Sequence, residues 1–309
     1  MKLRLLFVPL VALLLAGCNE GGAVGPNPFP TAPIGGSVGT SSLTFVDGGT
    51  GAPASGASVA VSGRQIATTD TDGKVTIEPP AEVGTLFDAV LDSKFLPRNT
   101  LIRSLTESVT LWPVSSSSPA EFFQELVFNE FVPRRRLSRP VVSAVYLRLS
   151  PEIANDPEAS EVHRQAAAVL TAAAGISYIV SDNPPTGASV YDMVVDSSQQ
   201  YIGLTYNRFS GNRITGEKVS YKYMVNARNL TAVAHELGHT LGLGHTSQRT
   251  LMNLGSTGTG ATDFSEAEKL AIKMMFQRYP GTQWPDNDRN SQAMSGFRGT
   301  IVIACGEPQ

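Results

Sequence analysis

The sequence lacks an excess of positive charge: it has 24 lysines and arginines against 27 aspartates and glutamates, for a net charge of −3. It also lacks a basic stripe interleaved with aromatic residues, so no nucleic-acid partner is indicated. Charged residues are sparse at 17%, whereas hydrophobic residues make up 41%. This balance excludes wholesale disorder and predicts a buried core. The 309 residues are enough for two domains of ordinary size.

Cysteine is nearly absent, and the two that occur, Cys18 and Cys305, lie far apart in the sequence. Cys18 follows two basic residues and an apolar run, 5–16, that is too short to span a bilayer permanently. This is the layout of a secretory signal. The letters LAGC that end the run resemble the lipobox of bacterial lipoproteins. An ordinary signal peptide with a chance cysteine is the alternative.

The lipobox resemblance implies that Cys18 receives lipid and becomes the first residue of the mature chain. We therefore expect residues 1–18 to form a lipoprotein signal peptide, and the Gly- and Pro-rich residues 19–37 to form a flexible tether. The lipid would anchor the chain to a membrane without spanning it. Asn19 favours an outer-membrane or surface position in the bacterial cell envelope. With Cys18 lipidated no intramolecular disulfide can form, and Cys305 is expected to be a partly buried thiol.

Residues 38–113 alternate apolar with polar residues in short segments such as SLTFVD and KVTIE, with turn sequences between them. The spacing predicts a small antiparallel β-sandwich. The runs 46–59 and 69–75 resemble the carboxypeptidase-regulatory-like, prealbumin-type sandwich. Within the second run Asp70-x-Asp72-Gly73 could begin a calcium loop, but the remaining ligands are missing. A hairpin turn is therefore favoured, and calcium is not indicated.

The rest of the chain predicts a second, larger domain. Residues 114–139 form a linker with a short amphipathic helix, 140–285 the larger domain, and 286–309 a C-terminal extension. Strand candidates surround a helix that is closed by Gly175, and Ser265 begins a last helix. The fold class predicted is an N-terminal all-β sandwich followed by an α+β domain. In the latter an active-site helix and a C-terminal helix pack on a twisted mixed sheet.

Three of the four histidines lie in the stretch HELGHTLGLGH, residues 235–245. His235 and His239 are four apart on a predicted helix capped by Asn229, so their imidazoles lie one turn apart and converge on a single ion. Gly242 lies where a helix commonly ends in a left-handed residue, and that turn returns His245 as a third ligand. A satisfied histidine cluster on an ordinary helix is the alternative.

Such a ligand set predicts chemistry. Three neutral histidines with an open fourth position usually hold a catalytic zinc, whereas structural sites are closed, often by cysteine. Both cysteines are remote in sequence, so we expect the site to be open. One zinc ion would activate a water as the nucleophile. Glu236 projects from a neighbouring face of the helix and would act as the general base.

The motif extends to H-E-x-x-H-x-x-G-x-x-H, and Met252 follows seven residues after its last histidine. It resembles the metzincin metallopeptidases with their Met-turn. Within them it is most similar to the matrixins, the matrix-metalloproteinase-like group, over residues 140–281. This resemblance implies that Met252 forms a hydrophobic floor beneath the zinc and does not bind it. Leu254 stands where astacins and serralysins have a tyrosine, which argues against a fifth ligand.

The sequence also departs from the family. The only other histidine is His163, so the structural zinc site of matrix metalloproteinases is absent as the family builds it, and we expect His163 to be a surface or satisfied histidine. No cysteine-bearing propeptide is present, so latency must come from elsewhere. The segment 254–264 is expected to form the far wall of the substrate pocket. KVSYKYMV, residues 218–225, is expected to supply the edge strand for an extended peptide.

Together these features predict a secreted, membrane-anchored zinc endopeptidase that hydrolyses peptide bonds of extracytoplasmic proteins. Its partners would be a protein or peptide substrate and, through the lipid on Cys18, a membrane; we expect a monomer. The alternative is a non-catalytic adhesin or binding lipoprotein that has kept the metzincin shell. The presence of Glu236 beside all three histidine ligands favours the enzyme.

Overall fold

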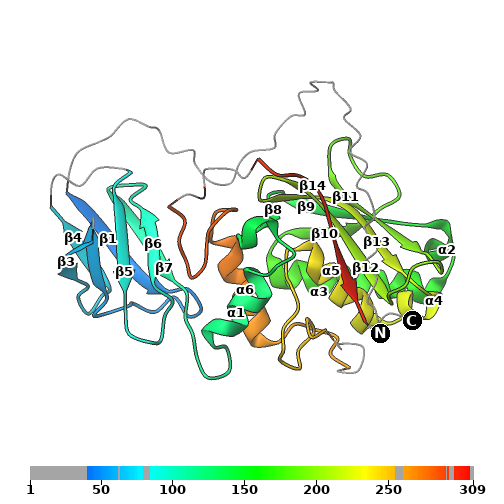
Figure 1. The fold of residues 1–309 in the computed structure, drawn as a ribbon, viewed down its shortest axis with the longest axis horizontal. Coiled ribbons are helices and arrows are strands. Elements are labelled where there is room, and N and C mark those ends of the chain that lie inside the picture. The colour runs from blue at the N-terminus through cyan, green and yellow to red at the C-terminus, as the bar shows by residue number, and fades with distance from the viewer. Residues whose placement is uncertain are drawn as a thin grey trace, which may run out of the picture.

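The fold is mixed α/β (Figure 1). In the computed structural model, the strands that are described form three sheets, of three, four and seven strands. The predicted signal, the lipobox with Cys18 and the tether lie outside the described residues. Within the described part of the chain no helix is both long and apolar enough to cross a membrane. The structure describes residues 40–61, 63–78, 84–254, 260–289, 291 and 296–306.

The first seven strands form the two smaller sheets. The three-stranded sheet has the order β4-β1-β7, and the four-stranded sheet has the order β3-β2-β5-β6. Each strand is short, as the spacing of turn residues in the sequence predicts. The bounds are β1 Ser41–Asp47, β2 Ser58–Val61, β3 Arg64–Thr68, β4 Lys74–Ile77, β5 Leu86–Val90, β6 Arg98–Leu101 and β7 Thr106–Leu111.

One cluster of buried apolar side chains is shared by both of these sheets. Alternation along β1 turns Leu43 and Phe45 inward, where both are fully buried. Phe45 meets Phe87 of the other sheet edge-on, with 5.9 Å between ring centroids. One pairing departs from the all-antiparallel expectation, because β1 and β7 run parallel, with Ser42 opposite Thr106.

The Asp70 carboxylate stabilises the turn that begins at this residue. Asp70 Oδ1 accepts hydrogen bonds from the backbone N–H of Asp72, at 2.9 Å, and of Lys74, at 2.8 Å. Gly73 has a φ of +72°, which glycine adopts without strain. The turn was predicted to close a hairpin, but it joins β3 to β4, which belong to different sheets.

The seven-stranded sheet carries the histidine helix. Its order is β10-β9-β11-β13-β12-β14, and the short β8 pairs with β13. The first four strands of this order run parallel, whereas β12 is antiparallel to both of its neighbours. The bounds are β8 Arg139–Pro140, β9 Ala144–Leu149, β10 Ser177–Val180, β11 Ser189–Val195, β12 Gly203–Ser210, β13 Arg213–Tyr221 and β14 Arg298–Cys305.

Local cap signals set the ends of the main helices. The Asp156 and Asn229 side chains cap the starts of α3 and α5. Gly175 ends α3 at a φ of +69°, and Ser265 with Glu268 forms the predicted capping box of α6. The helices are α1 Ala120–Val127, α2 Pro151–Ala154, α3 Pro157–Ala174, α4 Met224–Ala227, α5 Leu230–Thr240 and α6 Glu266–Phe276, with a 3₁₀ turn η1 at Pro133–Arg135.

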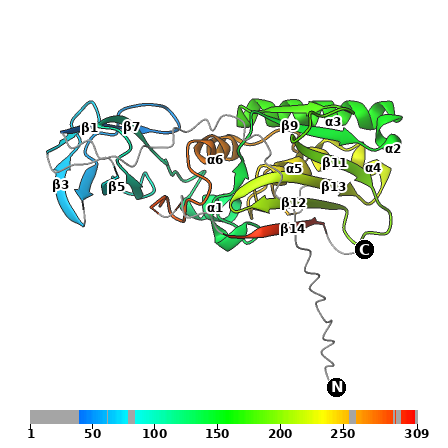
Figure 2. The ribbon, with the colours of Figure 1, turned by 90° about the horizontal axis from the view of Figure 1, so that it is seen from above.

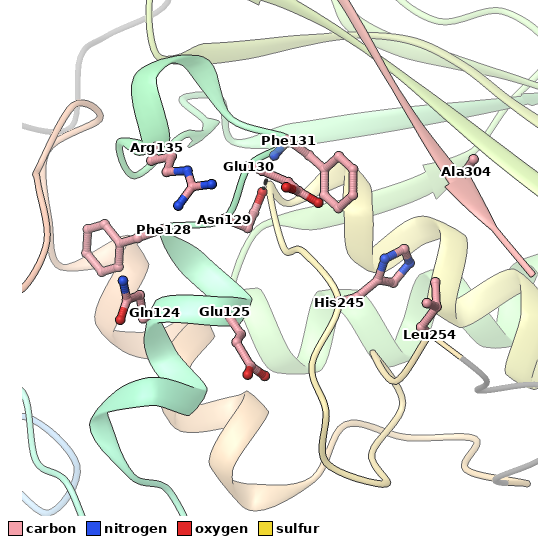
Figure 3. A pocket seen from close by; sticks show the side chains of 10 residues that line it. All are labelled: Gln124, Glu125, Phe128, Asn129, Glu130, Phe131, Arg135, His245, Leu254 and Ala304. Atoms are coloured by element: carbon pink, nitrogen blue, oxygen red, sulfur yellow. Dashed lines mark hydrogen bonds between the residues drawn. The ribbon is translucent and has the colours of Figure 1, made fainter. Parts of the chain in front are cut away.

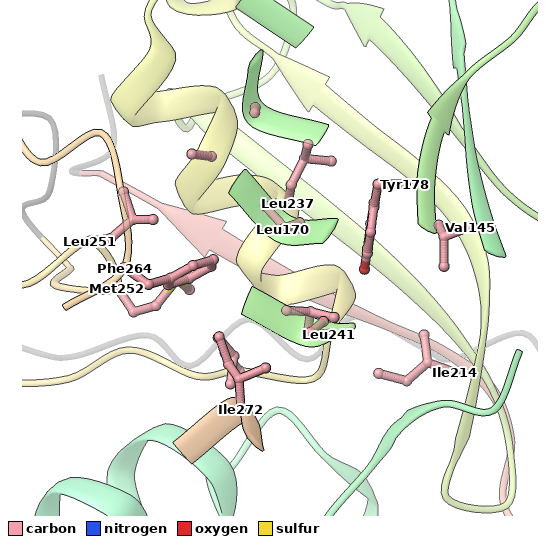
Figure 4. Packing of buried hydrophobic residues seen from close by; sticks show 14 of the residues in the cluster. Val145, Leu170, Tyr178, Ile214, Leu237, Leu241, Leu251, Met252, Phe264 and Ile272 are labelled. Atoms are coloured by element: carbon pink, nitrogen blue, oxygen red, sulfur yellow. The ribbon is translucent and has the colours of Figure 1, made fainter. Parts of the chain in front are cut away.

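The helices α3, α5 and α6 pack together beside the large sheet (Figure 2). Leu237 of α5 and Leu241, which directly follows the helix, are fully buried among side chains of the sheet and of the other helices (Figure 4). Leu251, Met252 and Phe264 close this core from the loop that follows α5. The histidine helix is therefore held from several sides by apolar contacts.

One expectation about the strands fails here. Residues 218–225 do not form an edge strand, because β13 lies inside the sheet between β11 and β12, and Met224 already belongs to α4. The strand beyond β12 is β14, which lies within the C-terminal extension expected for residues 286–309. Period-two alternation shows that a segment is a strand, but not which neighbours it takes.

Candidate metal centre

The helix α5 positions the first two histidines. The Asn229 side chain accepts a hydrogen bond from the backbone N–H of Ala232 at 3.2 Å, which fixes the first turn. Four residues separate His235 from His239, so both imidazoles leave the same side of the helix. Their ring centroids are 4.8 Å apart, and both side chains are almost completely buried.

Gly242 turns the chain back toward the other two histidines. Its φ is +95°, and a Cβ at this position would overlap the Ser138 carbonyl oxygen. Glycine is therefore required both by the backbone angle and by the close approach. After this turn the His245 ring lies 4.8 Å from His239, between centroids. Phe131 packs edge-on against His245 at 5.6 Å.

Backbone carbonyls fix the tautomers of the two helix histidines. His235 Nδ1 lies 2.7 Å from the Leu251 carbonyl oxygen, and His239 Nδ1 lies 2.8 Å from that of Leu243. A carbonyl only accepts, so each Nδ1 carries the proton and donates it. Each Nε2 then presents its lone pair to the other ligands, which is how metal-binding histidines are usually oriented.

The fourth member of the cluster is Cys305, at the end of β14. Its Sγ lies 3.2 Å from His239 Nε2 and 3.4 Å from His245 Nε2. All four ligand atoms, those of His235, His239, His245 and Cys305, lie within 4.8 Å of one another and could hold a metal ion. The expectation of a site left open by remote cysteines was wrong, because strand pairing brings Cys305 in.

Three of the separations between these atoms match those around a small tetrahedral ion, and the whole set lies within 4.8 Å. Bonds of about 2.0 Å to nitrogen and about 2.3 Å to sulfur place ligand nitrogens about 3.3 Å apart and nitrogen and sulfur about 3.5 Å apart. The Nε2 atoms of His235 and His239 are 3.2 Å apart. Two lone pairs that face each other at this distance repel unless a cation lies between them, so the donor set fits a bound metal.

Burial prepares the histidines to act as neutral ligands. It lowers the pKa of His235 to about 4 and, with the neighbouring His235 ring, that of His245 to about 3. Burial and the other two rings lower the pKa of His239 well below its ordinary value. Burial and the nearby Glu236 carboxylate raise the pKa of the Cys305 thiol. Only a cation in the cluster would favour its thiolate.

Glu236 lies on the sheet side of the same helix, 3% exposed. Thr205 of β12 donates a hydrogen bond from its hydroxyl to Glu236 Oε2 at 2.7 Å. A Cβ at Gly203 would overlap Glu236 Oε1, so this glycine leaves the space that the carboxylate occupies. Burial raises the pKa of Glu236 to about 7, while the hydrogen bonds from Thr205 and Cys305 act against that rise. Such a carboxyl group can exchange a proton near neutrality.

Met252 packs against α5 at Gly238 and is not among the four residues of the cluster. It is fully buried, and a Cβ at Gly238 of α5 would overlap its sulfur. Its backbone N–H donates to Glu268 Oε1 at 2.8 Å, and its carbonyl oxygen accepts from the Thr246 N–H at 3.0 Å. The buried Glu268 thus ties the turn at Met252 to the start of α6.

His163 lies outside the cluster. Its side chain is fully buried in α3, where Nδ1 is 2.7 Å from the Ala159 carbonyl oxygen and the ring packs edge-on against Tyr221. Burial lowers the pKa of His163 to about 4. His163 is therefore neither at the surface nor fully satisfied, contrary to expectation: it lies in the core, and its buried Nε2 has no hydrogen-bond partner among the described residues.

A pocket of about 450 Å³ lies beside His245 (Figure 3). It is bounded by α1, by the segment that follows it, by Leu254 and by β14. Leu254 begins the segment that we expected to form the far wall, although residues 255–259 lie outside the described part of the chain. The lining residues are Gln124, Glu125, Phe128, Asn129, Glu130, Phe131, Arg135, His245, Leu254 and Ala304.

Three residues of this centre were missed in the sequence. Thr205 and Asn207 are buried polar residues two apart on β12, and Asn207 Nδ2 donates to the His239 carbonyl oxygen at 2.8 Å. Two polar residues at the inward positions of a strand are a usable signal for a functional surface. Cys305 ends the run TIVIAC. The apolar residues of this run indicate a strand, and they predict that Cys305 is buried.

The comparisons with known proteins add no argument about the residues of this centre. No family model matches the sequence, and no curated protein matches it. Among solved structures, the chain is similar to an inactive mutant of the GH20 exo β-N-acetylglucosaminidase from Vibrio harveyi, with 8% identity and a TM-score of 0.23. The complex of that enzyme with N-acetylglucosamine has 9% sequence identity to this chain and a TM-score of 0.22. Both matches cover 64% of this chain and only 36% of the other, and a likeness this low carries no argument.

Proposed function

We propose that this chain is a zinc-dependent endopeptidase, similar to the matrixin group of metzincins. The observation that carries the proposal is the convergence of three histidine side chains with Glu236 beside them. His235 and His239 come from one helix, and His245 returns through the turn at Gly242. Their donor set suits zinc, since imidazole and thiolate are its usual ligands.

The chemistry follows from the placement of these side chains. A zinc ion held by the histidines supplies a Lewis acid that polarises the scissile carbonyl and activates water. Glu236, with a pKa raised to about 7, accepts the proton of the attacking water and returns it to the leaving amine. Thr205 holds the carboxylate in place through its 2.7 Å hydrogen bond. Met252 supports the helix without touching substrate.

We further propose that the chain has two domains and acts outside the cytoplasm. The support for two domains is the pair of separate apolar clusters, one in the smaller sheets and one around the large sheet. The sandwich would dock or space the peptidase, and the lipobox around Cys18 would anchor it in the bacterial envelope. The substrate would be a protein or peptide in extended conformation.

One observation favours a second candidate, a non-catalytic binding lipoprotein with a structural metal. Cys305 completes a His₃Cys set, and closed sets that include cysteine are common in structural zinc sites. In that case Glu236 would transfer no proton, and Thr205 and Cys305 would only supply hydrogen bonds to its buried carboxylate.

The test compares Glu236→Gln with Glu152→Gln, an exposed glutamate on α2. We expect about one zinc per chain in both variants by elemental analysis, and chelation removes it. Peptide cleavage should fall by at least about 10²-fold in Glu236→Gln and stay unchanged in Glu152→Gln. Turnover that survives Glu236→Gln, or that persists in metal-free protein, would contradict the proposed mechanism.

A further inference from the structure

The strand β14 covers the whole free side of β12. The two pair antiparallel over all eight residues of β14, from Arg298 opposite Ser210 to Cys305 opposite Gly203. In the order of the sheet β14 comes last, beyond β12, and Figure 2 shows it along that edge. The backbone of β12 next to Glu236 is therefore paired within the chain.

This strand is attached by few side chains. Of its eight residues only Ile303 and Cys305 are buried, and Val302 is 44% exposed. The buried residues of β12, such as Thr205, Asn207 and Phe209, contact the rest of the protein independently of it. Besides the backbone hydrogen bonds, β14 is held against the sheet by the apolar side chains of Ile301 and Ile303, by the Thr300 hydroxyl that donates to Glu217, and by the Cys305 sulfur.

The last residue of β14 reaches the two groups that a peptidase needs free. Its sulfur lies 3.2 Å and 3.4 Å from the Nε2 atoms of His239 and His245. It also hydrogen bonds to the Glu236 carboxylate. A peptide substrate requires the same two places, a free strand edge for its backbone and a free position at the metal for its carbonyl.

We propose that Arg298–Cys305 is an inhibitory strand built into the chain, with the Cys305 sulfur as fourth metal ligand and β14 in the place of an extended peptide substrate. This inference rests on the proposed peptidase function. The site is then latent while β14 is paired and becomes available when β14 leaves β12. The vacant edge takes an extended peptide, whose backbone restores the pairing that β14 gives up.

Release of β14 involves ligand exchange and no electron transfer. With a metal held in the cluster, the Cys305 thiolate would leave the ion and take up a proton from solvent, which would open a position for water. His235, His239 and His245 would still hold the ion. Cleavage within residues 296–304, a competing peptide or modification of the thiol would all shift the equilibrium toward the released state.

Cobalt substitution tests the ligand directly, without using activity. The full chain is loaded with Co²⁺ and compared with Cys305→Ser and with Val302→Ser, an outward-facing control on the same strand. We expect a sulfur-to-cobalt charge-transfer band in the wild type and in Val302→Ser. The band should be absent from Cys305→Ser, which keeps about one metal per chain. A wild-type spectrum without this band would overturn the assignment of Cys305.

Peptide cleavage by the zinc-loaded full chains tests the inhibition. If β14 is paired in at least nine molecules of ten, Cys305→Ser and Cys305→Ala should cleave peptides at least about tenfold faster than the wild type. Val302→Ser should match the wild type. Equal rates in the wild type and both Cys305 variants would overturn the inhibitory role while the peptidase function stood. If the cobalt band is present but no variant cleaves peptides, the proposed peptidase function is contradicted, and the inhibitory role of β14 with it. Cys305 would then be a structural metal ligand.

Discussion

Arg98 and Asp286 are 188 residues apart in the sequence and form a buried ion pair, with 3.0 Å between Arg98 Nη1 and Asp286 Oδ1. Arg278, two residues after α6, donates to the same carboxylate from Nε and Nη2, both at 2.7 Å. Arg98 also contacts Asp288 at 2.7 Å. This network joins β6 of the four-stranded sheet to the segment that follows α6.

The first prediction concerns that network. Asp286→Asn removes the charge that two buried guanidinium groups share, those of Arg98 and Arg278. Each buried guanidinium group then loses part of the negative charge that balances it. We therefore expect a loss of about 3–5 kcal/mol in the free energy of unfolding. Urea titration measures it. The control is Asp192→Asn, which breaks the exposed pair with Arg148 and should leave the free energy of unfolding nearly unchanged, because water screens that pair. Similar losses in both variants would show that the buried ion pairs contribute no more to the free energy of unfolding than the exposed pair does.

The second prediction concerns the turn after α5. Gly242→Ala adds a Cβ at a φ of +95° and against the Ser138 carbonyl oxygen. Gly187 has a similar φ, +78°, but a Cβ there would meet no atom within 4 Å. Gly187→Ala therefore measures the cost of the positive φ without a steric clash. We expect about 1–2 kcal/mol for Gly187→Ala and about 1–3 kcal/mol more for Gly242→Ala.

Metal content provides a second measurement on the same pair. Because His245 follows the turn, Gly242→Ala should also lose metal at a lower chelator concentration than the wild type, whereas Gly187→Ala should not. Equal stability and equal metal retention in the two variants would argue that the Gly242 turn does not position the third histidine.

The third prediction concerns pH and His163. Burial lowers the pKa of His163 from 6.5 to about 4, so the unfolded chain takes up a proton that the folded chain excludes. Stability is therefore fully present above pH 6.5 and falls as the pH drops from 6.5 toward 4. His163→Gln removes this titration. Between pH 7 and pH 5 the wild type should lose about 2 kcal/mol more than the variant.

Unfolding by urea at several pH values measures this difference. The other three histidines titrate in both proteins, so their contribution cancels in the comparison. Parallel pH profiles for wild type and His163→Gln would mean that His163 is protonated equally in the folded and unfolded chains.

Much of the helical structure was predictable because its signals are local. Asn229 precedes α5, and Ser265 with Glu268 begins α6, as their capping chemistry indicates. The spacing of His235, His239 and His245, with Gly242 between the last two, also predicted their convergence. Each of these inferences depends on residues a few positions apart, where backbone geometry leaves few alternatives.

The partners of the strands were not predictable in the same way. β13 was expected at the edge and lies inside the sheet, and β1 pairs with β7 in parallel. Alternation fixes which side of a strand is buried but not which strand lies beside it. Cys305 was misjudged for the same reason, since its distance from the histidines along the chain says nothing about strand pairing. Thr205 was missed because only the fold places it under Glu236.

The position of β14 in the sequence has a consequence for the order of synthesis. A ribosome makes β9 to β13, α5 and all three histidines before it makes Cys305. For that interval the nascent chain carries the histidines of the cluster without its sulfur. The thiol is thus the last of the four donor groups to be made, after all three imidazoles.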